Sequence, residues 1–128
     1  MNNTLRCITM VPTSVAIRQY RFVVMGNAGT IAEAASAGVD AVGVSQEASA
    51  TGSLTAIPLG ILDGTIQTIE AGAAISVAAA IVPIASDAQG RAITATTGHA
   101  ILGYALQTAG GAGEAISFIS TKPARASA

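Results

Sequence analysis

Short runs of alternating apolar and polar residues recur along the chain, and residues typical of turns separate them. A period of two predicts a strand with one buried face, and no segment keeps a helical period over about 11 residues or more. The spacing of these runs predicts an all-β fold of short antiparallel strands, either a small barrel or a sandwich, with at most one short helix. The predicted strands are residues 20–25, 30–32, 39–45, 54–62, 64–70, 75–84, 91–96, 99–106 and 114–120.

Two turn sequences predict hairpins between neighbouring strands. Residues 26–29 (GNAG) follow the first clear strand, and glycine and asparagine tolerate the positive φ angles that tight turns need. Asp63 and Gly64, between apolar flanks, form the strongest hairpin signal in the chain. Residues 32–37 (AEAASA) have helical propensity, but Gly38 ends the run, so we expect only a short turn or a capping helix there.

The 128 residues suffice for one domain or for two smaller units. Residues 1–19 alternate only weakly and precede the first clear strand, so we interpret them as an N-terminal arm, or a first strand, that orders on assembly. Residues 20–120 carry the other predicted strands and form the β-rich domain. Residues 121–128 (TKPARASA) are predicted to be a flexible tail.

An internal repeat is visible at an offset of about 60 residues. Residues 24–59 and 82–119 share one layout: an apolar strand, a glycine-containing turn, a short strand, a glycine, and a strand with a central glycine. Gly38 and Gly43 in the first copy match Gly98 and Gly103 in the second. The repeat predicts two similar β-units packed with pseudo-symmetry.

The composition favours association with other chains. Hydrophobic residues make up 51% of the sequence and aromatic residues 3%, so the core must consist of small side chains that bury modest area. Charged residues make up 10%, against about 25% in an average soluble domain. Because few charges protect the surface, subunit or partner contacts are expected to supply part of the stability.

Membrane and nucleic-acid partners are not expected. Residues 71–85, the most apolar window, are shorter than the about 20 residues of a membrane span and predict interior sheet or a subunit interface. The N-terminus lacks the continuous apolar stretch of a signal peptide, which predicts synthesis in the cytoplasm without export by that route. The six basic residues form no cluster suited to phosphate binding. They are Arg6, Arg18, Arg21, Arg91, Lys122 and Arg125.

The sequence offers little for catalysis, so we predict no catalytic, cofactor-binding or metal-binding residue and no enzyme. Cys7 and His99 are each the only residue of their type, and neither stands in a metal-ligand spacing. His99 is expected at a strand edge or in a loop. The nucleophile motif GxSxG is absent from the sequence. The acids fall mostly at turns or strand ends, where they keep edges soluble, and are Glu33, Asp40, Glu47, Asp63, Glu70, Asp87 and Glu114.

The rhythm of the second half resembles a known family. Its segments are residues 75–77 (ISV), 81–84 (IVPI), 87–91 (DAQGR), 103–106 (GYAL) and 114–119 (EAISFI). With these segments, residues 20–120 resemble the capsid cement or head decoration proteins of tailed bacteriophages. The resemblance implies a homo-oligomer, a dimer or trimer, that binds the major capsid protein on the outer surface of the virion. It also implies a mechanical role that braces neighbouring capsid subunits, with residues 1–18 as a candidate for capsid contact by strand addition.

Three alternatives stay open. A carbohydrate- or receptor-binding β-module would stack sugars on exposed aromatic residues, and only Tyr20 and Tyr104 offer this in the absence of tryptophan. Another phage structural subunit, such as a tail tube or fibre, or a bacterial shell subunit, suits the same composition. A small enzyme would need a site assembled from the scattered acids and His99.

Overall fold

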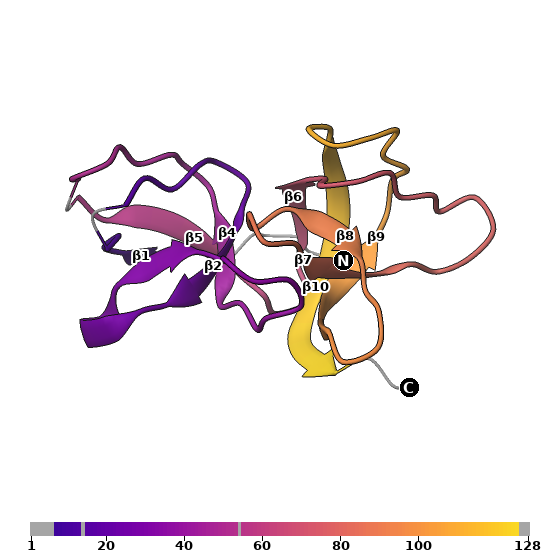
Figure 1. Cartoon of the computed structure of the whole chain (residues 1–128), viewed down its shortest axis with the longest axis horizontal. Coiled ribbons are helices and arrows are strands. Elements are labelled where there is room, and N and C mark those ends of the chain that lie inside the picture. Colours follow the sequence, from indigo (N-terminus) through magenta and orange to yellow (C-terminus); the bar gives the residue numbers. More distant parts are fainter. Residues whose placement is uncertain (1–6, 14, 54, 126–128) are drawn as a thin grey trace.

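The computed structural model describes residues 7–13, 15–53 and 55–125 and confirms the all-β prediction (Figure 1). The helical content of these residues is the 3-10 turn η1 (Asn27–Gly29). The first five strands are β1 (Cys7–Met10), β2 (Phe22–Met25), β3 (Ile31–Glu33), β4 (Gly43–Ser45) and β5 (Ile57–Ile61). The second five are β6 (Ile66–Glu70), β7 (Pro83–Ser86), β8 (Ala92–Thr94), β9 (Ala100–Ala105) and β10 (Ala115–Arg125).

The strands form two antiparallel five-stranded sheets that lie side by side (Figure 1). The first sheet has the order β1-β5-β4-β2-β3, and the second has the order β6-β10-β9-β7-β8. Neither sheet closes into a barrel, so the arrangement fits the sandwich among the predicted architectures. The chain completes the first sheet before it begins the second, which places β1–β5 on the left of Figure 1 and β6–β10 on the right.

The two sheets repeat each other pair by pair. Adding five to each strand number of the first sheet gives the order of the second. The parallel bridge between Pro12 and Ile31 recurs as the bridge between Ala71 and Ala92. The register also repeats: the row Phe22–Val44–Gly60–Cys7 across β2, β4, β5 and β1 recurs as the row Pro83–Tyr104–Ile119–Ile66 across β7, β9, β10 and β6. This structural repeat therefore extends beyond the ranges 24–59 and 82–119.

The apolar core has a small part and a large part. The first sheet has its own cluster, made of Ile17, Val23, Ile31, Ile57 and Leu59. The second sheet buries its residues in a larger cluster that also takes in Phe22, Ala34, Ala41, Val44 and Leu62 of the first sheet. The two phenylalanines of the chain, Phe22 and Phe118, meet edge to face with ring centroids 5.7 Å apart. The larger cluster thus joins the two sheets, while the smaller one belongs to the first sheet alone.

Both ends of the described chain are in strands, which for residues 7–10 fits the first strand that the sequence allowed there. Residues 7–10, placed in the arm by the sequence, form β1 and pair with β5. Ile17 is buried and bridges Ser49. Residues 121–125 continue β10 beyond the predicted end of the domain. The apolar side chains of Met10 and Ile17 complete the first core, which accounts for this order; residues 1–6 and 126–128 lie outside the described part.

Two local predictions were wrong. Asp63 and Gly64 close no hairpin, because β5 pairs with β1 and β4 while β6 pairs with β10. Residues 78–81, inside the predicted strand 75–84, form an exposed loop, as the small side chains of the alanine run bury little area. This loop lies in the segment that projects to the right in Figure 1. Residues 32–37 form the end of β3 and a turn, which fits the short turn that the sequence allowed there.

Candidate interaction surfaces

The boundary between the two sheets is held by a buried ion pair. Tyr20, at φ 60°, turns the chain into β2 just before Arg21. The Arg21 side chain is 6% exposed, and its guanidinium lies 2.9 Å from a carboxylate oxygen of Glu70. A second guanidinium nitrogen donates to the backbone carbonyl of Gln89 at 3.0 Å. If the sheets moved apart, the Arg21 guanidinium would stay buried without its partner carboxylate, which costs free energy. These contacts therefore fix the position of one sheet relative to the other.

Backbone hydrogen bonds reinforce this boundary. The amide of Phe22 donates to the carbonyl of Gly90 at 2.7 Å, and the amide of Gly38 donates to the carbonyl of Ser86 at 2.8 Å. Gly90 has φ +77°, and a Cβ there would lie 2.8 Å from the carbonyl oxygen of Phe22. Only glycine therefore allows the second sheet to approach β2 this closely.

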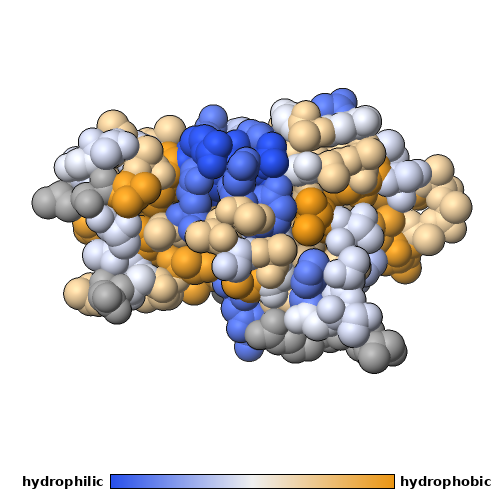
Figure 2. All heavy atoms as spheres, in the orientation of Figure 1, coloured by the Kyte–Doolittle hydropathy of each residue, from blue (hydrophilic) through white to orange (hydrophobic). Residues whose placement is uncertain are grey.

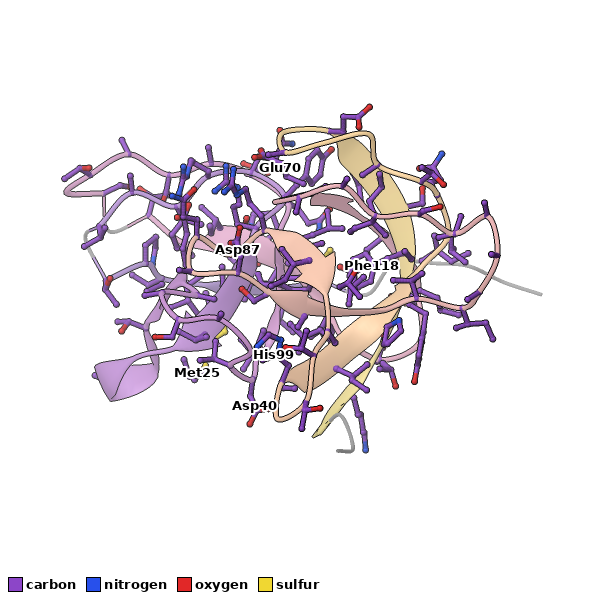
Figure 3. All side chains as sticks on the ribbon, turned by 45° about the vertical axis from the view of Figure 1, so that its right-hand side comes forward. Met25, Asp40, Glu70, Asp87, His99 and Phe118 are labelled. Carbon is purple, nitrogen blue, oxygen red and sulfur yellow. The ribbon has the colours of Figure 1, made fainter. Side chains whose placement is uncertain are left out.

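His99 packs against the same boundary. It precedes β9 and is half-buried, and a Cβ added to Gly38 would lie 2.2 Å from a carbon of the His99 ring. Its Nδ1 accepts a hydrogen bond from the amide of Thr96 at 3.2 Å. In this position the imidazole fills space between the sheets (Figure 3).

The other described ion pairs lie each within one sheet. Arg18 contacts Glu33 at 2.8 Å, and Arg91 contacts Asp87 at 3.1 Å. Burial alone would raise the pKa of Glu33, but hydrogen bonds from the side chain and backbone of Arg18 outweigh it and hold the pKa below its ordinary value. These pairs strengthen loops and strand ends and converge on no common site.

The side chains that commonly bind metals lie apart from one another in the described part of the chain. No three His, Cys, Asp or Glu side chains among them lie close enough to hold a metal ion. Figure 3 shows Glu70 and Asp40 at opposite sides of the molecule, and Cys7 is exposed on the edge strand β1. Within the same residues, no helix has the length and apolar character needed to span a membrane.

The apolar surface is the feature that distinguishes the two sheets. We call Phe22, Val44 and Gly60 the covered row, because all three are buried under the second sheet. The matching open row is Pro83, Tyr104 and Ile119, with Ile66 next along on β6. Tyr104, Ile119 and Ile66 are 36%, 37% and 40% exposed. The second sheet thus presents to solvent the same face that the first sheet buries.

Hydropathy over the whole surface agrees with this contrast. Figure 2 shows a strongly polar region over the boundary between the sheets and apolar surface on either side of it. Large apolar side chains exposed on the first sheet include Ile8, Val11 and Met25. These surfaces could not be located from the sequence, since alternation identifies a strand with one apolar face but not which face a partner covers.

The fold has a counterpart among solved structures. No family model and no curated protein matches the sequence. The structure is similar to the crystal structure of the head fiber gp8.5 N base in bacteriophage phi29, with a TM-score of 0.74. The match covers 98% of this chain and 100% of that chain, at 16% sequence identity. The two chains therefore share a fold over their full lengths while most of their residues differ.

Proposed function

We propose that this protein is a non-enzymatic structural component of a tailed-bacteriophage virion that binds the outer surface of the capsid. The observation that carries the proposal is the similarity of fold, over the full length of both chains, to the base of a phage head fiber. The low fraction of charged residues and the exposed apolar side chains on both sheets support it, because they suit a chain that lies against partners.

The finer proposal is a cementing role. As a homo-oligomer, a dimer or trimer, the module bridges neighbouring major capsid subunits. Each copy contributes a modest contact, and many copies resist expansion together because their contacts must fail together. The protein is then made in the host cytoplasm and resides on the outside of the mature head.

Two parts of the described chain suit contact with a capsid. The loop that includes residues 78–81 projects from the second sheet, and Ile81 there is 82% exposed. β1 is an edge strand of the first sheet, so its outer edge is available for strand addition. Strand addition at β1 replaces the capsid-binding role that the sequence suggested for a free arm.

The second candidate function is the base of a head fiber, which the structural neighbour favours directly. A cement increases the resistance of the capsid to heat, since it links subunits to each other. A fiber base needs only to attach and carry a further segment or chain, and it leaves that resistance unchanged. The two candidates share capsid binding and differ in this one property.

The test is to mix the purified protein with capsids that lack surface proteins and to measure co-sedimentation. Saturable binding supports the proposal, and no binding at any ratio contradicts it. The heat-release temperature of packaged DNA is then measured with and without the bound protein. An increase supports cementing, and an unchanged temperature with full occupancy supports the fiber base. Capsid binding by Ile81→Asp tests whether the exposed loop contacts the capsid. Val77→Asp changes a less exposed residue packed against the core and shows the effect of misfolding on the same measurement.

A further inference from the structure

We infer that copies of this protein associate head to tail, through the open row of the second sheet of one copy and the matching open face on the first sheet of the next. The argument starts from the repeat. The two sheets have the same strand order and register, so a residue of one sheet at the boundary between the sheets has a counterpart in the other sheet. The counterparts named below lie away from that boundary and do not make the corresponding contact.

One side of the internal boundary is the covered row with Arg21. Their counterparts are the open row and Val82, since the bond from the Ser45 amide to the Arg21 carbonyl recurs as the bond from the Ala105 amide to the Val82 carbonyl. Phe22 and Val44 are fully buried, while their counterparts Pro83 and Tyr104 are partly exposed. The second sheet therefore repeats the docking surface of the first sheet, and among the residues that the structure describes this surface is partly open to solvent.

The other side of the boundary lies on the second sheet. There Gln67 contacts Gly60, and Glu70 contacts Arg21. Ser86 contacts Gly38, and Gly90 contacts Phe22. We call Gln67, Glu70, Ser86 and Gly90 the receiving face. The strand register, together with the equal lengths of the β2–β3 and β7–β8 turns, identifies the counterpart of each residue on the first sheet. We call these counterparts the open receiving face: Ile8, Val11, Met25 and Gly29.

The open receiving face is apolar and accessible. Ile8, Val11 and Met25 are 44%, 37% and 49% exposed. A Cβ at Gly90 would collide with Phe22, whereas a Cβ at Gly29, which has a similar φ of +73°, has nothing within 4 Å. Of the nine large hydrophobic residues exposed in the described part of the chain, five lie on these two open faces: Ile8, Val11, Met25, Tyr104 and Ile119.

Chemical pairing is consistent across the two contacts. Inside the chain Arg21 meets Glu70, and the counterpart positions are Val82 and Val11. A charged pair within the chain is thus replaced by an apolar pair between copies. Inside the chain Gly60 meets Gln67, and the counterparts Ile119 and Ile8 are both apolar. At these two positions both open faces are apolar.

The contact between copies cannot be identical to the internal one. Gly60 has room only for Gln67, since a Cβ there would lie 2.4 Å from the Gln67 side chain. Ile119 and Ile8 together are bulkier than this pair, so the faces of two copies must lie further apart. Pro83 also lacks the amide with which Phe22 bonds Gly90. The contact between copies therefore relies more on apolar burial and less on hydrogen bonds than the internal one.

This geometry determines the type of assembly. Each copy uses two different faces, so the contact is heterologous: it excludes a two-fold dimer, which pairs one face with itself, and adds copies until they close into a ring, such as a trimer, or form an open chain. The inference deepens the proposed self-association and does not depend on capsid binding. It is tested on the purified full-length chain without capsids, so its failure and that of the proposed function are distinguishable.

The first experiment is sedimentation velocity over a range of protein concentrations. We expect the native chain to form a species larger than a dimer at about 100 µM. Val11→Asp and Ile119→Asp should each raise the concentration needed for half-assembly by about tenfold or more, since each places a charge in an apolar contact. Val15→Asp changes an exposed valine outside both open faces and should leave assembly unchanged. Circular dichroism and the urea midpoint verify that each variant is folded.

The second experiment separates head-to-tail from two-fold association. Val11→Asp keeps an intact open row, and Ile119→Asp keeps an intact open receiving face, so an equimolar mixture should form a dimer that grows no further. A third variant, Val82→Arg with Val11→Glu, recreates the internal ion pair between copies and should assemble better than either single substitution. Any one of three results would overturn the inference. The native chain could remain monomeric, both Val11→Asp and Ile119→Asp could leave assembly unchanged, or the mixture of these two variants could form no dimer.

Discussion

The first and second sheets have the same strand order and register, and the turn from β2 to β3 has the same length as that from β7 to β8, yet corresponding residues meet different surroundings. Val44 is fully buried and its counterpart Tyr104 is 36% exposed; Gln67 is buried and its counterpart Ile8 is 44% exposed. The backbone repeat therefore does not determine burial. Position relative to the neighbouring sheet does. At one position the residue type follows this difference: Gly60 lies where the second sheet approaches, and its counterpart Ile119 lies in the open row.

Removing the largest side chain of the covered row should show this difference most strongly. Phe22→Ala empties a fully buried site in contact with Phe118 and should reduce the free energy of unfolding by about 3–5 kcal/mol. Tyr104→Ala, in the open row, should cost less than about 1 kcal/mol in the isolated chain. Urea unfolding of both variants measures the contrast. Equal losses would mean that the two rows are equally buried in solution.

The ion pair at the boundary should have the next largest effect. Arg21→Val leaves the Glu70 carboxylate, which is 26% exposed, without its cation and should cost about 2–3 kcal/mol. Arg21→Val with Glu70→Val installs the apolar pair of the counterpart positions and should recover part of that loss. Urea midpoints of the native, single and double variants test this. A double variant less stable than the single one would show that the charges stabilise the boundary beyond mutual compensation.

Two glycines with similar backbone angles isolate the contact between the sheets. Gly90→Ala and Gly29→Ala both place a Cβ on a residue with positive φ, +77° and +73°. Only the first also meets backbone atoms of the other sheet, so it should cost about 1–2 kcal/mol more than the second. Thermal unfolding of the pair gives this difference. Equal costs would indicate that the second sheet shifts freely away from Phe22.

The smallest effect concerns a pair within the first sheet. The lowered pKa of Glu33 means that its contribution to stability is present above the ordinary value of 4.5 and is lost as the pH falls through the lowered value. Because Arg18 is half exposed, the loss should stay below about 1 kcal/mol. Glu33→Gln should lack this component. Urea unfolding between pH 6 and pH 3 compares the two chains, and parallel curves would contradict the assignment.

The sequence predicted the strands better than their partners. Alternation located segments such as β2 and β10 because a half-buried strand leaves that pattern in its own residues. The partner of a strand leaves no local pattern, which is why Asp63 and Gly64 were misread as a hairpin. The open row was equally hidden, since Tyr104 and Ile119 become neighbours only through the pairing of β9 with β10. That the sequence predicts no catalytic residue stays a prediction.

The short connection between β5 and β6, residues 62–65, tethers the two sheets closely. The internal contact therefore forms at a high effective concentration, independent of how much protein is present. The proposed contact between copies has no such tether, so it is expected to depend on protein concentration. If that proposal holds, each chain completes its own boundary first, and a surface that concentrates the protein locally sets when copies associate.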